Sequence, residues 1–396
     1  MTTTYERILD HASRADPYPL YAELRETPVA RQPDGSYVVS TYREIVSLLH
    51  DPRVSSVAED QDARLSDLPQ PFIRLDPPDH DRLRRLAMRH FGPPESPGRI
   101  DALIPRMTGI VTGLIDGLAG RGKVDIVDDF AYPLPVTVIC ELLGVPREDE
   151  PLFHQWSQTI ISTIDPGTGS MAERTRRRAL TLTELGHYLD GLADERLRRP
   201  ADDLLSGFVS EQEFPRGDLL ATSALLLVAG HETTVNLIAN GVLTLLRHPH
   251  ALGRLHREPG WAPAVVEELL RYEPPVQFLA PLRHALADIE LAGVTIPRGA
   301  VITIALAAGS RDPARFHDPD RFDPDRVDNQ HLGFGGGIHH CFGAPLARLE
   351  TQLALAEFAR RFIGPRLVAD PPPYRPHPFL RGPRHLLVEF DDIVPA

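Results

Sequence analysis

A ten-residue stretch near the C-terminal end of the chain, FGGGIHHCFG at residues 334–343, gathers side chains that can do chemistry. Cys341 offers a thiol, and His339 and His340 offer imidazoles beside it. The chain has only one other cysteine, Cys140, in the apolar stretch VTVICELLG. A cysteine can serve as a small buried apolar group, a nucleophile or a metal ligand. The residues around Cys341 therefore indicate which of these roles it has.

Two of the chemical roles lack the partners that they need. A structural zinc site takes four ligands, commonly as two closely spaced pairs, and no second pair accompanies His339, His340 and Cys341. A nucleophilic cysteine needs a histidine base that reaches its sulfur from elsewhere in the fold, and the sequence identifies none. A buried structural cysteine stays open as the plain alternative.

The glycines favour a different metal ligand. Glycines on both sides of Cys341 remove side chains and let the backbone approach a flat, bulky group. Pro345 suits the first turn of a helix whose apolar stripe runs through Leu346, Leu349 and Leu353. The positive end of that helix favours a thiolate. A thiolate held against a planar surface is typical of the axial ligand of a haem iron.

The same stretch resembles the haem-binding loop of the cytochrome P450 family, whose pattern is Phe-Gly-x-Gly-x-His-x-Cys-x-Gly. The matching positions are Phe334, Gly335, Gly337, His339, Cys341 and Gly343. The resemblance implies haem b as the cofactor, with Cys341 as the axial thiolate and Phe334, Gly335 and Gly343 beside the haem. It extends to three further motifs and covers essentially the whole chain.

One of these motifs is EELLRY, which places Glu268 and Arg271 three residues apart on one helix face. Taken alone, the pair would be an ordinary surface ion pair worth a few tenths of a kcal/mol. It resembles the Glu-x-x-Arg motif of the family, and FHDPDRF resembles the segment that supplies Arg321 as the third member. The resemblance implies a structural triad that holds the thiolate loop.

A second motif is LDPPDHDRLRRL, in which Asp76 is a plausible helix cap and His80 and Arg84 share a face. By resemblance, His80, Arg84, Arg283 and His339 bind the haem propionates, a task that suits the planar fork of arginine. For any one of them the alternative is an ordinary surface cation.

A third motif, LLLVAGHETTVNLI, places Ala229, Gly230, Glu232 and Thr233 in a long apolar helix. Without the resemblance, Gly230 would be a close helix contact and the threonines would bond to carbonyls one turn earlier. The motif resembles the oxygen-activation segment of the family. The resemblance implies that Ala229 and Gly230 contact the haem and that Glu232 and Thr233 are catalytic. They would supply the protons that reductive O–O cleavage consumes.

The elements that position these residues are mostly helices. Apolar residues recur at helical spacing over residues 99–119, 175–199 and 218–248, and the last stretch is apolar on most faces. Residues 29–42 predict a hairpin, residues 287–306 three short strands, and residues 379–390 a second hairpin. We expect a mainly α protein with a smaller β region, a single domain over 1–396. By resemblance it has the cytochrome P450 fold, with the haem between the long core helix and the helix that follows Cys341.

Composition excludes several classes of function. The net charge of −13 argues against nucleic acid as a partner, and no apolar run is long enough to cross a membrane. The N-terminus lacks a signal peptide and two distant cysteines make no disulfide framework, so we expect a cytoplasmic protein.

The resemblance implies a bacterial haem-thiolate monooxygenase that inserts one atom of O2 into a small hydrophobic organic substrate, in specialised metabolism. It also implies a ferredoxin as electron donor and a monomeric protein. Arg82, Arg85, Arg89 and Arg348 form a candidate basic docking surface for that ferredoxin, against the alternative of a solvated helix face. The substrate pocket is expected around residues 65–75, 156–164, 226–229, 276–280 and 379–380. Other hypotheses are a peroxide-using P450, a non-catalytic recruitment protein and a haem-based gas sensor.

Overall fold

The computed structural model describes residues 2–57, 69–163 and 168–396. The chain groups into two compact units. The first unit comprises Met1–Ser55, Pro105–Leu134 and Thr233–Ala396, and the second comprises Ser56–Ile104 and Pro135–Glu232. The expectation of a single domain over 1–396 stays a prediction.

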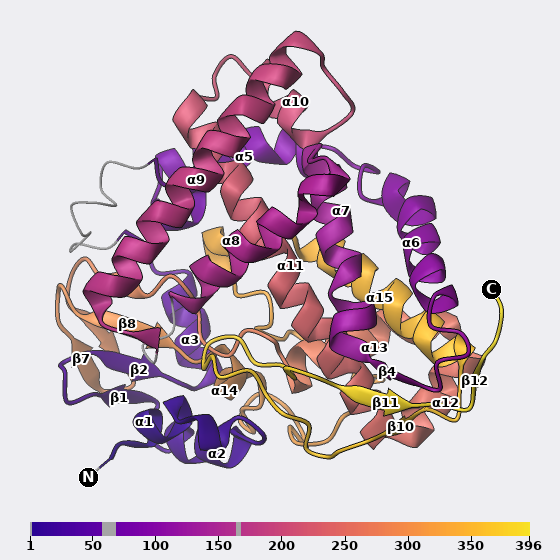
Figure 1. The fold of residues 1–396 in the computed structure, drawn as a ribbon. Coiled ribbons are helices and arrows are strands. Elements are labelled where there is room, and N and C mark those ends of the chain that lie inside the picture. The colour runs from indigo at the N-terminus through magenta and orange to yellow at the C-terminus, as the bar shows by residue number, and fades with distance from the viewer. Residues whose placement is uncertain (1, 58–68, 164–167) are drawn as a thin grey trace. The chain divides into compact units, whose positions relative to one another are not determined.

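Helices supply most of the regular structure, as predicted (Figure 1). Those wholly or almost wholly in the first unit are α1 (Thr4–Leu9), α2 (Tyr18–Arg25), α3 (Tyr42–Leu49), α6 (Ile104–Asp116), α12 (Pro249–Arg257), α13 (Ala262–Tyr272), α14 (Leu306–Ser310) and α15 (Ala344–Arg361). Those of the second unit are α5 (Asp79–Phe91), α7 (Pro133–Leu143), α8 (Glu150–Ser162), α9 (Met171–Arg198) and α10 (Leu204–Ser210). Short 3₁₀ turns include η1 (His11–Ser13), η2 (Phe72–Arg74), η3 (Asp101–Leu103), η5 (Arg147–Asp149), η7 (Pro259–Trp261) and η8 (Gly337–His339), and η4 (Val127–Ala131) is a π-helix.

The longest helix is α11 (Arg216–Arg247), which contributes to both units. Every residue from Thr234 to Leu245 is buried, so this half of α11 runs through the core of the first unit, as its apolar sequence predicts. Gly241 permits close packing there: an added Cβ would lie 2.8 Å from Leu355 Cδ1 of α15 and 3.1 Å from Leu269 Cδ1 of α13. The core helix therefore contacts the helix that follows Cys341.

The strands lie in the first unit. The largest sheet has the order β1-β2-β8-β5-β3, in which β2 and β8 are parallel and the other pairs are antiparallel. Its strands are β1 (Val29–Arg31), β2 (Tyr37–Val39), β8 (Val301–Ile304), β5 (Arg283–Ala285) and β3 (Val54–Ser55). The smaller sheets contain β4 (Lys123–Asp125), β6 (Ile289–Leu291), β7 (Val294–Ile296), β9 (Phe362–Ile363), β10 (Arg366–Leu367), β11 (Leu387–Glu389) and β12 (Asp392–Ile393).

Turn chemistry explains which predicted strands form. The hairpin of β1 and β2 turns at Gly35, where φ is 87°, and β6 and β7 turn at Ala292 and Gly293, both with positive φ. These elements confirm the first hairpin and the three strands within 287–306. The predicted hairpin at 379–390 is wrong, because β11 pairs with β10 and β4 instead. A local pattern cannot distinguish these distant partners from a neighbouring strand.

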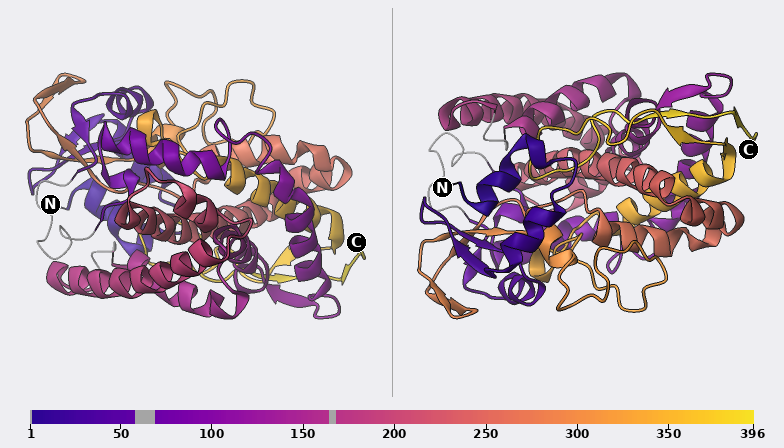
Figure 2. Two further views of the ribbon diagram at one scale, coloured as in Figure 1. Left: turned by 90° about the horizontal axis from the view of Figure 1, so that it is seen from above. Right: turned by 90° about the horizontal axis from the view of Figure 1, so that it is seen from below.

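Helix packing within each unit follows the apolar faces. In the second unit, α9 begins at a capping box, in which Ser170 and Glu173 each bond the other's backbone N–H, and it packs along α8. In the first unit, α1 and α2 lie side by side at the indigo end of the chain (Figure 2). Among the described residues, none of the helices combines the length and the apolar composition that a membrane span requires.

Ile302 tests whether the large sheet depends on its central strand. Its side chain is fully buried in β8, between Tyr37 of β2 and Arg283 of β5. We expect Ile302→Ala to lower the free energy of unfolding by about 2–5 kcal/mol, measured by guanidinium denaturation. The control is Ile363→Ala in β9, which is 40% exposed and should cost far less. Equal losses in the two variants would contradict the central position of β8.

Candidate active site

Cys341 lies in a tight loop between η8 and α15. The amide N–H of Cys341 donates to the carbonyl of Phe334 at 2.9 Å, and that of Gly335 donates to the carbonyl of Leu332 at 2.8 Å. These bonds fold residues 332–341 back on themselves and leave the Cys341 side chain partly exposed. The sequence pattern therefore produces a loop that presents one thiol.

Two glycines make the path of this loop possible. Gly335 and Gly337 have φ values of 68° and 63°, a region that disfavours other residues. An added Cβ on Gly337 would lie 1.9 Å from the carbonyl oxygen of Leu49, at the C-terminal end of α3. Gly337 is thus required by space as well as by backbone angle.

The two cysteines differ in their chemical state. Cys140 lies in α7 with 1% exposure, and burial, together with the nearby charges of Glu150 and Glu141, raises its pKa to about 12. It therefore stays a protonated thiol at neutral pH. Neither cysteine forms a disulfide, and the partly exposed Cys341 is the candidate ligand.

The helix after the loop begins as predicted, but it turns a different face inward. α15 starts at Ala344 with Pro345 in its first turn. Of the predicted stripe, only Leu346 is fully buried, while Leu349 and Leu353 are partly exposed. The buried face comprises Ala344, Leu346, Glu350, Thr351, Ala354, Leu355, Phe358, Ala359 and Arg361, because α15 packs against both α13 and α12.

Glu350 on this buried face is an acid that the sequence analysis missed. Its side chain is 1% exposed, and neither carboxylate oxygen has a hydrogen-bond partner among the described residues. Burial raises the pKa of Glu350 well above its usual value, which favours the neutral form of the carboxyl group. A helical pattern containing LARLE gives no sign that its acid points inward.

A second network supports the Cys341 loop from outside. The guanidinium of Arg348 donates to both oxygens of Glu267, at 2.6 and 3.0 Å, and lies 4.6 Å from the centroid of the Phe334 ring. His331 Nε2 is 3.1 Å from the same carboxylate. Burial opposes ionisation of Glu267, but its bonds to His331 and Arg348 prevail and lower its pKa to about 2. Glu267 and His331 were missed because a Glu-Glu pair does not reveal which acid faces the loop.

The adjacent Glu268 forms a fully buried ion pair with Arg271. Both side chains have no exposed surface, and the two bonds between them measure 2.7 and 2.8 Å. Arg271 also donates to the carbonyls of Ser310, Pro319 and Arg321. The predicted pair is therefore a core element, because an exposed pair would not make these bonds.

The prediction that the Arg321 side chain is the third member of the triad is wrong. Arg321 contributes its backbone carbonyl to Arg271, and its side chain is exposed. The second arginine near Glu268 is Arg326, whose Nε lies 3.5 Å from Glu268 Oε2 as a charge contact. Its Nη1 donates to the carbonyl of His317 at 2.6 Å. Arg321 and Arg326 lie five residues apart in one turn-rich segment, and the sequence alone does not show which of them points toward Glu268.

Two predicted propionate ligands lie in the first unit. Arg283 is 3% exposed in β5 and donates to the carbonyl of Pro281 at 2.6 Å. His339 is partly buried at the end of η8, two residues before Cys341. The position of Arg283 depends on β8, which pairs with β5 along its length.

The other two predicted propionate ligands lie together on α5 in the second unit. His80 Nδ1 is 2.7 Å from Asp81 Oδ1, and its ring meets the ring of Phe72 edge-on at 6.3 Å. The guanidinium of Arg84 lies 5.8 Å from the same Phe72 ring. The shared helix face of His80 and Arg84 is confirmed.

The expected cap of this helix is wrong. α5 begins at Asp79 after Pro78 with no side-chain cap, and it is the backbone carbonyl of Asp76 that accepts the His80 amide, at 3.0 Å. The Asp76 Oδ1 accepts a hydrogen bond from the Ser56 amide at 3.0 Å instead.

The segment that resembles an oxygen-activation motif lies in the middle of α11. Glu232 is 3% exposed and Thr233 is partly buried, whereas Ala229 one turn earlier is exposed. At Gly230 an added Cβ would approach Ile139 Cγ1 of α7 to 3.3 Å. His231 Nδ1 donates to the carbonyl of Leu227, and its Nε2 is 3.9 Å from Glu232 Oε1. His231 has no predicted role, although it stands between two assigned residues, Gly230 and Glu232.

These residues fit a haem by their donor chemistry. The Cys341 thiol stands in a glycine loop, and an added Cβ at Gly343, two residues on, would meet no atom within 4 Å. A soft thiolate is a haem-iron ligand, and a buried arginine suits a propionate. The acid and hydroxyl of Glu232 and Thr233 are adjacent on one helix.

Comparisons with known proteins agree with this chemistry. A family model described as Cytochrome P450 matches residues 261–390. The 6-deoxyerythronolide B hydroxylase of Saccharopolyspora erythraea is 37% identical over 415 residues, which cover 98% of this chain and 100% of that protein. Cytochrome P450 107B1 of the same organism is 38% identical and covers 91% of each chain.

Solved structures extend the likeness to the fold. The ligand-free crystal structure of CYP164A2 from Mycobacterium smegmatis has a TM-score of 0.89 and 40% identity, covering 98% of this chain and 100% of that one. The myxobacterial CYP267B1 in complex with myristic acid has a TM-score of 0.88 and 38% identity, covering 98% and 99%.

The reassignment of the third core arginine can be tested directly. Arg326→Ala removes the charge beside buried Glu268, so we expect it to lower the free energy of unfolding by about 1–3 kcal/mol and to reduce retained haem. Arg321→Ala keeps the backbone carbonyl that Arg271 uses, so stability and haem content should stay near those of the unmodified protein. Chemical denaturation measures the free energy of unfolding, and haem absorbance per protein measures the haem content. A larger loss in Arg321→Ala would restore the original assignment.

Proposed function

Because this chain belongs to the cytochrome P450 family and is a monooxygenase, we propose that it uses haem b with Cys341 as the axial thiolate. We further propose that the reaction inserts one atom of O2 into a hydrophobic organic substrate in bacterial specialised metabolism. The observation that supports this assignment most is the contrast between its two cysteines. Cys341 is presented by a glycine loop, whereas burial keeps Cys140 protonated.

We assign the haem contacts residue by residue. Cys341 would bind the iron, and His80, Arg84, Arg283 and His339 would hold the propionates. Phe334, Gly335, Gly343, Ala229 and Gly230 would contact the haem, since small residues let backbone approach a flat group. When bound, a thiolate-ligated haem supplies the iron at which O2 is reduced and its O–O bond is cleaved.

Glu232 and Thr233 would move protons to the reacting oxygen. Reductive O–O cleavage consumes protons, and a pocket that excludes water needs side chains to carry them. The Thr233 hydroxyl can donate at the reaction site and the Glu232 carboxyl can resupply it. His231, 3.9 Å from Glu232, is a further titratable group at this position.

Residues that would line the substrate pocket are mostly apolar. Of the predicted segments, 69–75, 156–163, 226–229, 276–280 and 379–380 belong to the described residues, and residues 65–68 and 164 lie outside them. The similar proteins act on 6-deoxyerythronolide B in one case and hold myristic acid in another. These names support a hydrophobic substrate class for this chain.

We propose an acidic ferredoxin as the electron donor and a monomeric, cytoplasmic enzyme. Two cysteines that form no disulfide suit a reducing compartment. The candidate docking surface is weaker than its sequence implies. Arg82 lies within 3.6 Å of Asp79 and Asp218, Arg89 pairs with Glu211, and Arg348 pairs with Glu267. Arg85 is exposed and has no ion-pair partner among the described residues, so it is the residue best placed to contact a donor.

Replacing Cys341 tests the thiolate assignment. We expect the ferrous–CO complex of the purified protein to show the absorption band of thiolate-ligated haem, and Cys341→Ser to abolish that band together with turnover. Cys140→Ser is the matched control, and its band should be unchanged because the buried thiol is protonated. Loss of the band in Cys140→Ser, with retention in Cys341→Ser, would overturn the assignment.

Replacing Thr233 tests the proton relay. Without its hydroxyl, reducing equivalents should be released as hydrogen peroxide, so we expect product per reductant consumed to fall about tenfold or more while substrate affinity stays near normal. The measurement compares reductant oxidation, product and peroxide in one reaction. Thr244→Ala, a buried threonine further along α11, serves as the control. Unchanged coupling in Thr233→Ala would leave its hydroxyl with a structural role only.

A further inference from the structure

The side chain of Arg381 joins segments that lie far apart in the chain, and it is only 2% exposed. Its Nε donates to the carbonyl of Arg14 at 2.8 Å, and its Nη2 donates to the carbonyl of Ala15 at 2.9 Å. Its Nη1 pairs with Glu273, the C-cap residue of α13. One guanidinium therefore connects the C-terminal region to an N-terminal segment and to the end of a core helix.

The Glu273 carboxylate is shared by two arginines. Its Oε2 pairs with Arg381 and accepts a hydrogen bond from the Tyr18 hydroxyl at 3.2 Å, while its Oε1 is 3.3 Å from Arg311 Nη2. The Arg311 guanidinium also lies 3.3 Å from the ring centroid of Tyr18 and 3.8 Å from that of Tyr272. Burial opposes ionisation of Glu273, but the charges of Arg381 and Arg311 prevail and lower its pKa. The carboxylate is therefore charged at neutral pH and attracts both guanidinium groups.

This ion pair lies beside a junction of two irregular segments. The Arg381 amide donates to the Pro275 carbonyl at 2.7 Å, and the Gln277 amide donates to the Phe379 carbonyl at 2.8 Å. These hydrogen bonds flank an isolated β-bridge and belong to none of the sheets of the described residues. So short a pairing is only marginally stable by itself, and the side chains around it must therefore contribute to its position.

The bridge consists of Val276 and Leu380, whose side chains share a face because they lie directly opposite each other. Both are apolar and partly exposed. The neighbouring Phe278 and Phe379 are buried with their ring centroids 5.4 Å apart, and Phe278 also meets the ring of Tyr21 in α2. The junction therefore has a buried side that packs on α2 and an accessible apolar side. Both of its segments are among those expected to line the substrate pocket.

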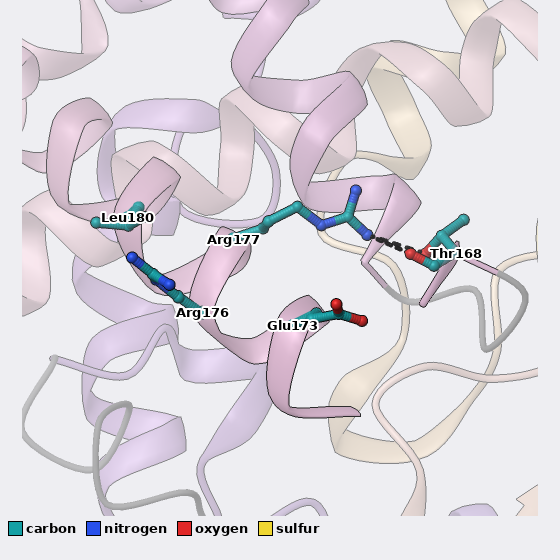
Figure 3. A pocket seen from close by; sticks show the side chains of 5 residues that line it. All are labelled: Thr168, Glu173, Arg176, Arg177 and Leu180. Carbon is teal, nitrogen blue, oxygen red and sulfur yellow. Dashed lines mark hydrogen bonds between the residues drawn. The ribbon is translucent and has the colours of Figure 1, made fainter. Parts of the chain in front are cut away.

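Burial distinguishes Arg381 from arginines whose bonds water can replace. Arg177 is exposed in α9 and donates to the carbonyl of Thr168 at 2.7 Å. It belongs to an open hollow, whose lining residues are Thr168, Glu173, Arg176, Arg177 and Leu180 (Figure 3). Loss of an exposed bond of this kind is largely compensated by solvent. Loss of the Arg381 guanidinium would remove the donor of several buried bonds at once, and water could not take its place.

We propose that Arg381 and Glu273 are positioning residues for the substrate. Their ion pair fixes segments 276–280 and 379–380 against the N-terminal segment, and so determines which apolar molecules fit the pocket wall. The proposal rests on the monooxygenase function above and adds two residues that act on the substrate through others. The N-terminal segment, held through two of its carbonyls, belongs to the same support.

Two azoles separate the pocket wall from the iron site. Imidazole binds through the haem iron alone, whereas clotrimazole carries the same ring with three aryl groups that need an apolar wall. We expect the purified haem-loaded enzyme to bind clotrimazole about a hundredfold or more tightly than imidazole in spectral titrations. Arg381→Met and Glu273→Gln should each lower the clotrimazole affinity about tenfold or more and leave the imidazole affinity within about twofold.

Arg361→Met is the matched control for lost stability. Arg361 is 1% exposed, pairs with Asp116 and donates to the Val394 carbonyl at 2.8 Å. Its replacement should also lower the melting temperature but keep the clotrimazole affinity within about twofold. If Arg381→Met does not fold, Arg381→Lys keeps a charge beside Glu273. It should still lose about threefold or more of the clotrimazole affinity, because one ammonium cannot replace all the bonds of the fork.

Hydrogen exchange tests the junction itself. The Gln277 amide donates across it and should exchange about tenfold or more faster in Arg381→Met, but keep its protection in Arg361→Met. The ferrous–CO band, recorded on the same samples, reports the thiolate assignment separately. Absence of the thiolate band, beside a clotrimazole affinity that still falls in Arg381→Met, would refute the proposed function and leave the positioning role standing.

Three results would overturn the proposal. The first is a ratio of clotrimazole to imidazole affinity that is unchanged in both Arg381→Met and Glu273→Gln. The second is an equal loss of clotrimazole affinity in Arg361→Met, which would make the effect one of stability alone. The third is an unmodified enzyme that binds clotrimazole no more tightly than imidazole, which would mean that the accessible apolar side of the junction lines no pocket.

Discussion

The buried pair of Glu268 and Arg271 is the constraint on which the first unit depends. Neither charge touches water, so each must find its partners inside the protein, and removing one partner of such a pair costs about 3–5 kcal/mol. Arg271 meets this demand with carbonyls between Ser310 and Arg321, and Glu268 accepts a bond from the Asp323 amide. The irregular segment that leads toward Cys341 is therefore shaped by two side chains of one helix. Regular hydrogen bonding does not hold it.

The Cys341 loop is held on three sides by different forces. The Leu49 carbonyl excludes any side chain at Gly337, the Phe334 carbonyl accepts the Cys341 amide, and the Arg348 guanidinium packs on the Phe334 ring while Glu267 neutralises it. The adjacent acids of α13 thus stabilise different parts of the structure. Glu268 faces the core and Glu267 faces the loop, and both act through arginines. The thiol is positioned by steric exclusion and electrostatics together, which a flexible glycine loop alone would not achieve.

The predictable parts of this protein are those in which local sequence and tertiary demand coincide. The loop around Cys341, the apolar α11 and the hairpin at Gly35 each carry their own signal in residue type and spacing. Arg321 was predicted as the third member of the core triad, but the side chain beside Glu268 is that of Arg326. The direction of a side chain in an irregular segment depends on the ion pair that the segment surrounds. The buried face of α15 and the partners of β11 likewise depend on neighbours far away in the chain.

The pairing of β2 with β8 joins two segments that lie far apart in the chain. Tyr37 leaves the ribosome long before its partner Ile302. The separation in sequence between Leu49 and Gly337 is larger still, so their contact forms later. At about 5–20 residues per second the first of these delays is roughly 15–50 s. During this interval one edge of the nascent β1–β2 hairpin has no strand to pair with, and the loop that carries Cys341 does not exist. The proposed haem ligand Cys341 therefore becomes available only late in synthesis, long after the N-terminal third of the chain has been made.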